Sequence, residues 1–161
     1  MNKLQGRRKL RRKESSKIMN TYRHTQTGYA LLIGLGMGEL LVLAIMPFIP
    51  GGGVASIVVV TLVICAILFS TLTISIGNGV LYAKFGPGLI WKTVKLAELV
   101  SCRVIQIRWW YGWGIHLTPH GWLYNVSGYG AVEITLRSGK RFCLGSDEPA
   151  ELCEAITRAI A

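Results

Sequence analysis

Two long apolar runs near the start of the chain limit its fold more than any other feature. Residues 28–50, GYALLIGLGMGELLVLAIMPFIP, contain one charged side chain, Glu39, and residues 54–76 contain none. A helix rises about 1.5 Å per residue, so a run of this length reaches across the ~30 Å apolar layer of a bilayer. We therefore predict a transmembrane helical hairpin. It covers residues 28–70, with helices at about 28–49 and 54–70, and the second run is expected to change from helix to strand within 70–76.

The composition and the distribution of charge agree with a membrane protein. Of the 161 residues, 51% are hydrophobic, the mean hydropathy is +0.41 and the formal net charge is +10. Residues 1–27 hold nine basic residues and one acidic residue, whereas the Pro- and Gly-rich connection at 47–53 holds no charge. Because basic segments stay on the cytoplasmic side, this predicts a multi-pass protein with both termini in the cytoplasm. A cleaved signal peptide is the alternative for the first run, but the run is too long and no clear cleavage site follows it.

The basic tail at 1–27 is expected to act on topology and on lipid. Its densest part consists of Arg7, Arg8, Lys9, Arg11, Arg12 and Lys13. Each Lys or Arg near an anionic membrane surface contributes ~1 kcal/mol before screening, which favours adhesion to anionic lipid. We do not expect nucleic acid as the partner, because no aromatic side chain or folded reader stands beside this tail.

Beyond residue 70 the pattern changes to short alternating runs separated by Gly, Asn and Pro, which is typical of strands and hairpins. In AVEITLRSGKRFCLG, at 131–145, apolar residues alternate with polar ones on both sides of the turn at 138–139. Strands are predicted at 72–76, 80–85, 89–94, 99–107, 115–118, 122–126, 132–136 and 142–144. Residues 148–160 predict an amphipathic helix whose apolar stripe must cover the sheet. We expect 71–161 to form one small antiparallel domain.

The order of elements resembles that of a known family, and several sequence fragments make this resemblance more specific. They are FGPG at 85–88, YGWGI at 111–115, GWLYNVSG at 121–128, AVEITLRSGKRF at 131–142 and GSDEP at 145–149. They are similar to small bacterial membrane proteins in which a two-helix membrane hairpin is fused to a pleckstrin-homology-like (PH-like) domain, over residues 54–161. The resemblance implies an α+β protein of the bacterial cytoplasmic (inner) membrane, with a PH-like β-barrel or sheet capped by a C-terminal helix. It implies no activity, cofactor or ligand.

The stretch WWYGWGIHLTPHGWLYNVSG, at 109–128, holds four of the five tryptophans. Its candidate contact residues are Trp109, Trp110, Tyr111, Trp113 and Trp122. Three interpretations are open: the aromatic side chains fill the core, they anchor the domain at headgroup depth, or they form a platform for a ligand or a protein partner. The glycines at 112 and 114 predict a tight bend that divides the tryptophans between two faces.

The sequence contains no familiar catalytic or metal-binding pattern. His116 and His120 have the spacing of two helical metal ligands, but Pro119 breaks any helix between them. The four cysteines form no C-x-x-C pair, which favours reduced thiols over a zinc site or a disulfide framework. We therefore expect no metal, no cofactor and no enzymatic activity of a familiar kind.

Glu39 is chemically the most unusual residue, because a carboxylate inside a membrane span costs several kcal/mol unless it is neutral or partnered. Counting eight residues back from Pro47 and eight residues on from Gly53, the two ends of the connection, places Thr61 opposite Glu39 as a hydrogen-bond partner. Gly34 and Gly38 lie beside Glu39 at a spacing that lets another helix approach closely. Glu39 then either cements the hairpin or an oligomer, or lines a path for ions or protons.

Two function classes follow. The first is a binding or scaffold module, a PH-like domain held at the cytoplasmic face of the membrane that recognises a protein segment or a lipid headgroup. The alternative is a homo-oligomeric membrane assembly, such as a channel or transport accessory, in which the hairpin with Glu39 is the working part. The expected partners are the lipid bilayer, anionic lipid or a protein, and further copies of the chain.

Overall fold

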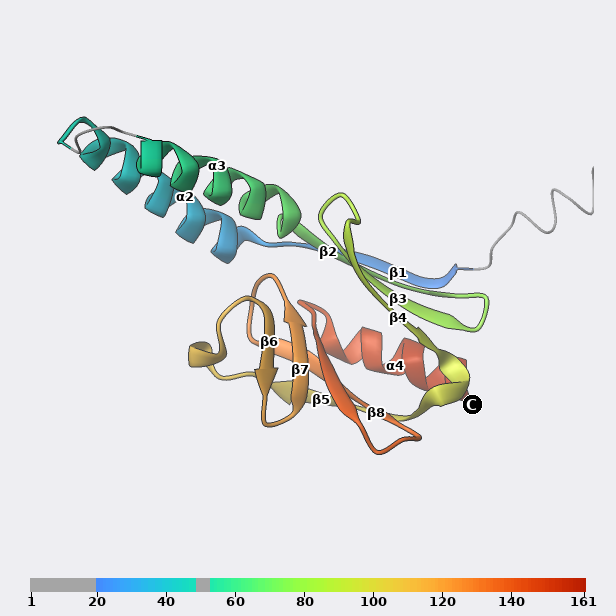
Figure 1. The fold of residues 1–161 in the computed structure, drawn as a ribbon. Coiled ribbons are helices and arrows are strands. Elements are labelled where there is room, and N and C mark those ends of the chain that lie inside the picture. Colours follow the sequence, from blue (N-terminus) through green and yellow to red (C-terminus); the bar gives the residue numbers. More distant parts are fainter. Residues whose placement is uncertain (1–19, 49–52) are drawn as a thin grey trace, which may run out of the picture.

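The computed structural model describes residues 20–48 and 53–161. Its elements, in chain order, are β1 (Asn20–Thr27), α2 (Tyr29–Ile45), η1 (Met46–Phe48), α3 (Gly53–Leu68), β2 (Thr71–Gly77), β3 (Val80–Phe85), β4 (Ile90–Lys95), η2 (Leu96–Glu98), β5 (Leu99–Gln106), η3 (Trp109–Tyr111), β6 (Gly114–Thr118), β7 (Gly121–Asn125), β8 (Gly130–Leu136), β9 (Arg141–Gly145) and α4 (Pro149–Ile160). Figure 1 shows α2 and α3 side by side, projecting away from the strands.

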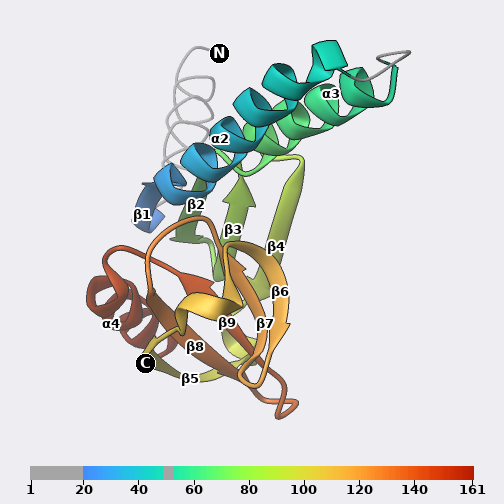
Figure 2. The ribbon, with the colours of Figure 1, turned by 90° about the vertical axis from the view of Figure 1, so that its left-hand side faces the viewer.

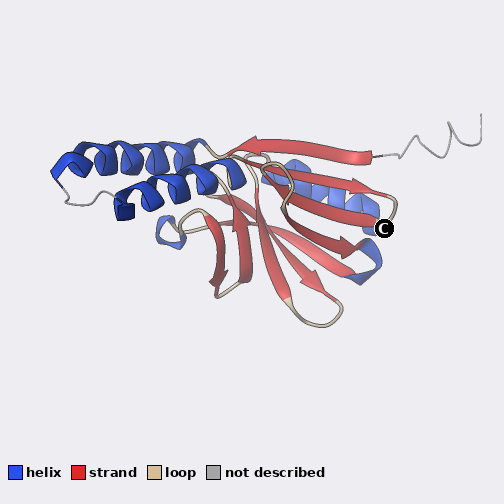
Figure 3. Ribbon diagram, turned by 45° about the horizontal axis from the view of Figure 1, so that its top comes forward, coloured by secondary structure: helices blue, strands red, loops and turns tan. Residues whose placement is uncertain are grey.

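The strands form two sheets. The first has the order β1-β2-β3-β4 and is antiparallel throughout. The second has the order β5-β8-β9-β7-β6, and its β7–β9 pair is parallel. Helix α4 contacts β5 and β8 of the second sheet and β1 and β2 of the first. Figure 3 shows the strands of both sheets in red with α4 beside them.

One apolar core joins the inner faces of the two sheets to α4. Burying a Leu, Ile or Phe side chain contributes ~1.5–3 kcal/mol, so this core is the main source of stability. The four-stranded sheet contributes Leu72, Ile74, Ile76, Leu81 and Phe85, the five-stranded sheet Val132, Ile134 and Leu144, and α4 Leu152 and Ile156. In β2 every second residue is buried, which is the pattern of a strand with one face on the core.

The helix pair stands outside this core. No residue of α2 is buried, and Ala55 is the buried residue of α3. Leu40 is 69% exposed and Phe48 is 84% exposed. The 20-residue segment Tyr29–Phe48, with a mean hydropathy of 2.1, is the one helix in the described ranges that is long and apolar enough to cross a membrane.

The predicted two-helix transmembrane hairpin is wrong, because the second helix is too short. Helix α3 spans 16 residues, which is about 24 Å at the rise of an α-helix, less than the ~30 Å apolar layer of a bilayer. It ends at Leu68, where the Ser70 hydroxyl donates to the carbonyl of Ile67 and the chain enters β2. The second apolar run is therefore divided between a helix and a buried strand.

The prediction of a single small antiparallel sheet within residues 71–161 is also wrong. The positions of the strands beyond residue 70 and of the C-terminal helix are confirmed to within two residues at each end. However, β1, from before the helices, completes the first sheet by pairing with β2. The chain therefore forms two sheets of four and five strands, and the first cannot form from residues 71–161 alone.

The expectation of four reduced thiols is wrong for one pair. Cys102 on β5 and Cys153 on α4 are joined by a disulfide, with their Cα atoms 5.8 Å apart, within the usual range for disulfides. Cys143 is buried and Cys65 is half-buried as free thiols. A separation of 51 residues carries no pairing signal in one sequence, and the proximity follows from the packing of α4 along β5.

We predict that Gly86→Ala destabilises the protein more than Gly79→Ala. Both glycines have a positive φ, 45° and 74°, so alanine costs about 1 kcal/mol of backbone strain at either position. A Cβ at Gly86 would also collide with the carbonyl groups of Ile67 and Leu68, whereas at Gly79 it would meet nothing within 4 Å. Denaturant unfolding of the full chain in detergent should show a loss of about 1 kcal/mol for G79A and roughly 3 kcal/mol for G86A. Equal losses would mean that the β3–β4 turn is not packed on the end of α3.

Candidate functional site

The aromatic turn, defined as Trp109, Trp110 and Tyr111, forms the short helix η3 after β5. Trp109 is 72% exposed and Trp110 is 56% exposed. Their rings meet edge to face at 5.8 Å, and the guanidinium of Arg108 lies 4.9 Å from the centre of the Trp110 ring. This arrangement presents a cation and two indole rings outward, which suits a lipid headgroup layer or a protein surface.

The structure divides the predicted aromatic stretch between two faces of the five-stranded sheet. Tyr111 packs against a small buried cluster that contains Ile107 and Leu123. Trp122 precedes Leu123 on β7 and so points to the opposite face, where its cross-strand partner is the exposed Leu117. The structure therefore brings Trp109, Trp110 and Tyr111 together in one turn and places Trp122 elsewhere, on β7.

Trp113 stands between two glycines that give the chain its bend. Gly112 and Gly114 have φ values of +70° and +112°, a conformation that other residues adopt only with strain. Trp113 is half-buried. The ring of His116 lies against both glycines, 3.3 Å from where a Cβ of Gly114 would stand. The bend that the glycines predicted is thus present.

The aromatic turn lies on the side of the molecule toward which α2 and α3 extend. Figure 1 shows η3 displaced from the five-stranded sheet in the direction in which the helix pair projects. Figure 2, which looks at the molecule from that side, shows η3 in front of the sheet and the helices above it. The helix pair and the short helix η3, whose two tryptophans are exposed, therefore lie toward the same side of the molecule.

A cluster of charged residues on the outer face of the five-stranded sheet was not expected from the sequence. The carboxylate of Glu133 on β8 is 5% exposed, and it accepts a hydrogen bond from Arg103 at 2.9 Å. Its other oxygen lies 2.7 Å from Nδ1 of His120 and 3.7 Å from the guanidinium of Arg141. Arg103 lies directly opposite Glu133 in the ladder, so cross-strand register sets this pair.

One of the two histidines that were considered as metal ligands belongs to this cluster. His120 is held by Glu133, and the Nε2 atom of His116 is buried with no hydrogen-bond partner among the described residues. Cys143 lies opposite Glu133 on β9, and burial, followed by the charge of Glu133, raises the pKa of its thiol to about 12. In the described ranges, no group of three or more His, Cys, Asp or Glu residues is arranged to hold a metal ion.

The intramembrane residues that the sequence singled out do not form a joint site within the helix pair. Thr61 donates its hydroxyl hydrogen to the carbonyl of Ile57, one turn earlier on α3. A Cβ at Gly34 or Gly38 would meet nothing within 4 Å, so these glycines are not used for packing against α3. Glu39 is half-buried on α2. Its pairing with Thr61 stays a prediction.

Residues 1–19 of the basic tail lie outside the described residues, whereas residues 20–27 form β1. This concerns Arg7, Arg8, Lys9, Arg11, Arg12 and Lys13, whose expected contact with anionic lipid stays a prediction.

Sequence reasoning missed the charged cluster because its four residues lie on three different strands and one turn. Arg103, His120, Glu133 and Arg141 are far apart along the chain, and each is explained locally by a strand face or a turn. The strand β1 was missed for a related reason. Its sequence, NTYRHTQT, alternates without an apolar face, so nothing in it predicts a strand.

Comparison of the chain with protein-family models, with curated proteins and with solved structures gives no match. The resemblance to the PH-like membrane family stays a prediction.

We predict that Glu133→Gln is costly and that the matched Glu154→Gln is not. Glu133 is buried among three basic partners, so removing its charge should lower the free energy of unfolding by about 2 kcal/mol. Glu154 pairs with Arg158 one turn away on the exposed face of α4, and such a pair contributes roughly 0.5 kcal/mol or less. Denaturant unfolding in detergent measures both. A similar small loss for both variants would show that the Glu133 cluster does not stabilise the sheet.

Proposed function

We propose that this chain is a membrane-anchored binding module without enzymatic activity. In this proposal the exposed helix α2 inserts into a bilayer as the anchor, and α3, which is too short to cross, packs against it without spanning the membrane. The two sheets and α4 are held at the membrane surface, where they bind a ligand. The observation that carries the proposal is the exposure of α2, an apolar helix with no buried residue.

The anchor is argued from the cost of leaving α2 and α3 in water. Apolar surface removed from water contributes roughly 25 cal/mol per Å², and large apolar side chains on both helices are left exposed by the rest of the chain. On α2 they include Ile33, Met37, Leu40 and Leu41, and on α3 they include Val54, Ile57, Val60 and Ile64. A contiguous apolar surface of this kind marks a contact with a membrane or with a protein. The apolar layer of a bilayer covers all sides of such a pair at once.

The aromatic turn supports the same arrangement. Trp side chains are enriched at the level of lipid headgroups, because the ring is apolar while its N–H remains hydrated. Trp109 and Trp110 are exposed on the side toward which the helices extend (Figure 2). Arg108 beside them adds a positive charge that suits anionic lipid. We propose that this turn rests at the membrane surface when α2 is inserted.

The pairing of β1 with β2 keeps the start of α2 and the end of α3 together, next to the sheets. The backbone N–H of Gly28, before α2, donates to the carbonyl of Ser70, after α3, at 2.8 Å. Residues 1–27 are strongly basic, and we propose that this side faces the cytoplasm of a bacterial cell. The Cys102–Cys153 disulfide is more typical of an oxidising compartment, so the side of the membrane needs its own test.

We predict that the wild-type chain stays in the membrane pellet after extraction with alkaline carbonate. The double variant Leu40→Lys, Leu41→Lys should shift to the supernatant, because each Lys at the centre of an inserted helix costs ~2.5–3.5 kcal/mol. Val100→Lys is the matched control, since Val100 is an exposed apolar residue of β5. Release of the wild type by carbonate would refute the anchor, as would equal release of the control.

We predict that protease added outside spheroplasts leaves the two sheets intact and cleaves them only after lysis. The charge of the residues before α2 and the Lys residues on β3 and β4 favour this orientation. Cleavage from outside would place the sheets on the other face of the membrane, where the Cys102–Cys153 disulfide is chemically expected. A disulfide assay by thiol labelling of the same membranes gives an independent reading of the compartment.

A further inference from the structure

The outer face of the four-stranded sheet is polar and positively charged. The strands β1 to β4 contain no Asp or Glu, and three of their four Lys and Arg residues, Arg23, Lys84 and Lys95, lie on this face. Cross-strand register places Arg23, Ser75 and Tyr82 in one row across β1, β2 and β3. The next row holds Thr25, Thr73 and Lys84. Side chains alternate along a strand, so both rows point away from the core.

The nearest acidic residues lie on the other side of this sheet. His24, next to Arg23 on β1, points inward and contacts the carboxylates of Asp147 at 2.6 Å and of Glu148 at 3.2 Å. These acids stand at the start of α4, beneath the sheet. In the described part of the chain, no carboxylate lies within ion-pair distance of Arg23 or Lys84. No described residue therefore neutralises the positive charge of Arg23 and Lys84 on the outer face.

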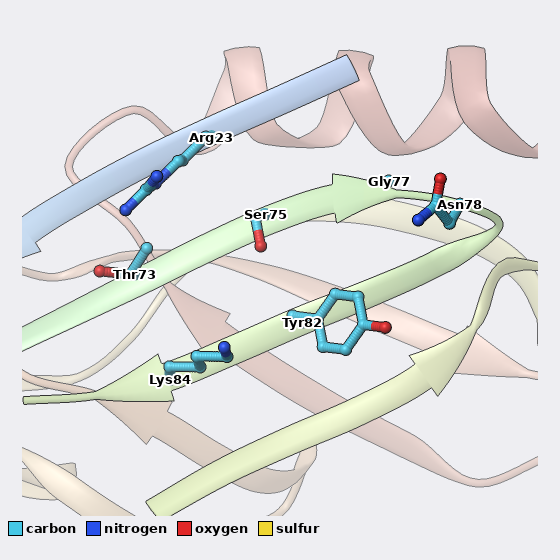
Figure 4. A pocket seen from close by; sticks show the side chains of 7 residues that line it. All are labelled: Arg23, Thr73, Ser75, Gly77, Asn78, Tyr82 and Lys84. Carbon is cyan, nitrogen blue, oxygen red and sulfur yellow. The ribbon is translucent and has the colours of Figure 1, made fainter. Parts of the chain in front are cut away.

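These side chains line a cavity of about 300 Å³ on the outer face. It is lined by Arg23, Thr73, Ser75, Gly77, Asn78, Tyr82 and Lys84. Figure 4 shows Arg23 along β1 and Lys84 and Tyr82 on β3, with Thr73 and Ser75 of β2 between them. The Lys84 ammonium lies 5.9 Å from the centre of the Tyr82 ring. The cavity is thus bounded by a guanidinium on one side and an ammonium on the other.

Two of the three hydroxyl groups that line the cavity make no hydrogen bond to another described residue. The hydroxyls of Ser75 and Tyr82 have no hydrogen-bond partner among the described residues, whereas the hydroxyl of Thr73 is paired with that of Thr25 at 2.9 Å. Arg offers a planar fork of N–H donors, which matches two oxygens of one phosphate group. Lys supplies a point charge, and hydroxyls donate to the remaining oxygens.

We propose that this cavity binds a phosphate group, carried by a lipid headgroup or free in solution. Two cations, the hydroxyls of Ser75 and Tyr82 and the Asn78 amide line this space, and none of the described residues that line it is acidic. A phosphate monoester provides several acceptor oxygens and up to two negative charges, which this donor set satisfies better than a single carboxylate does. The inference rests on the proposed binding role of the sheets, and it gives that role its ligand class.

The position of the cavity relative to the anchor makes a lipid phosphate accessible. Lys84 is two residues from Gly86, which packs on the backbone of Ile67 and Leu68 at the end of α3. Arg23 is on the strand that leads directly into α2. A phosphate at the surface of the bilayer and a phosphate dissolved in the cytoplasm are therefore two sources of one chemistry, and the experiment separates them.

The test uses the full-length chain in a neutral detergent. Binding of inorganic phosphate is measured by calorimetry, and binding of short-chain phosphatidic acid by native mass spectrometry, with short-chain phosphatidylcholine as the zwitterionic comparison. The variants are Arg23→Gln and Lys84→Gln, with Ser75→Ala as a variant that keeps both charges. Lys140→Gln is the matched control, because Lys140 is an exposed cation in the β8–β9 turn of the other sheet.

We expect saturable binding of inorganic phosphate, of phosphatidic acid or of both by the wild type. Loss of one charge-assisted contact should weaken this binding roughly tenfold or more in R23Q and in K84Q, and less in S75A, with no measurable change in K140Q. Binding of phosphatidic acid alone would identify a lipid source, and binding of inorganic phosphate would identify a free one. No saturable binding of either, or an equal loss in K140Q, would overturn the inference. Because this test is made in detergent, it can succeed even where carbonate extraction refutes the anchor.

Discussion

The antiparallel ladder between β1 and β2 is the constraint on which the rest of the structure depends. It places Thr27, at the end of β1, opposite Thr71, at the start of β2, so the chain must leave and re-enter the sheet at one point. Closing the long segment between them costs chain entropy, which grows slowly with its length. The buried alternate residues of β2 offset this cost. The helices α2 and α3 are therefore continuations of two neighbouring strands, and they emerge together on one side of the molecule (Figure 1).

The same ladder separates charges between two faces of one short strand. On β1, His24 points inward to the acids at the start of α4, and Gln26 donates to the carbonyl of Ser127 at 2.7 Å. Arg23, the residue before His24, points to the opposite face of β1 and lines the cavity. The alternation of side chains along β1 thus connects this strand to α4 and to the 126–129 loop. It also leaves the guanidinium of Arg23 without an acidic partner among the described residues. The outer face depends on β1, because without it the cavity would lose one of its two cations.

Several elements of the structure were predictable because their signals are local. The strands from β2 onward carry alternating apolar residues with Gly at the turns, and α4 carries an apolar stripe with Pro at its start, so these elements were predicted to within two residues. The fold class was not predictable in the same way. The pairing of β1 with β2 is a contact across the two helices, and the residues of β1 have no apolar periodicity that announces it. The end of α3 at Leu68 was hidden within an apolar run that remains apolar through the buried strand after it.

The candidate sites divide in the same way, between features with a local sequence signal and features made by residues far apart in the chain. The aromatic stretch and its glycine bend were recognised, because Trp-rich and Gly-rich segments stand out in composition, but the sequence left open whether the tryptophans are buried or exposed. The Glu133 cluster and the Arg23–Lys84 cavity were not, because cross-strand register brings their members together from separate strands.

An anchor of the proposed kind changes the affinity that a phosphate site on the sheet needs. A site bounded by two exposed cations is screened by salt and by water, so the free energy it gains from a phosphate in solution is modest. Tethering converts the encounter with a headgroup into an intramolecular one, with an effective concentration on the order of millimolar for a short connection. Lys84 is two residues from Gly86, which packs against the carbonyl groups of Ile67 and Leu68 at the end of α3, so the cavity is held close to the anchor. A lipid phosphate therefore needs much less intrinsic affinity than a free one to occupy the same cavity, which makes weak, salt-sensitive binding to the bilayer surface the physically simplest use of this face.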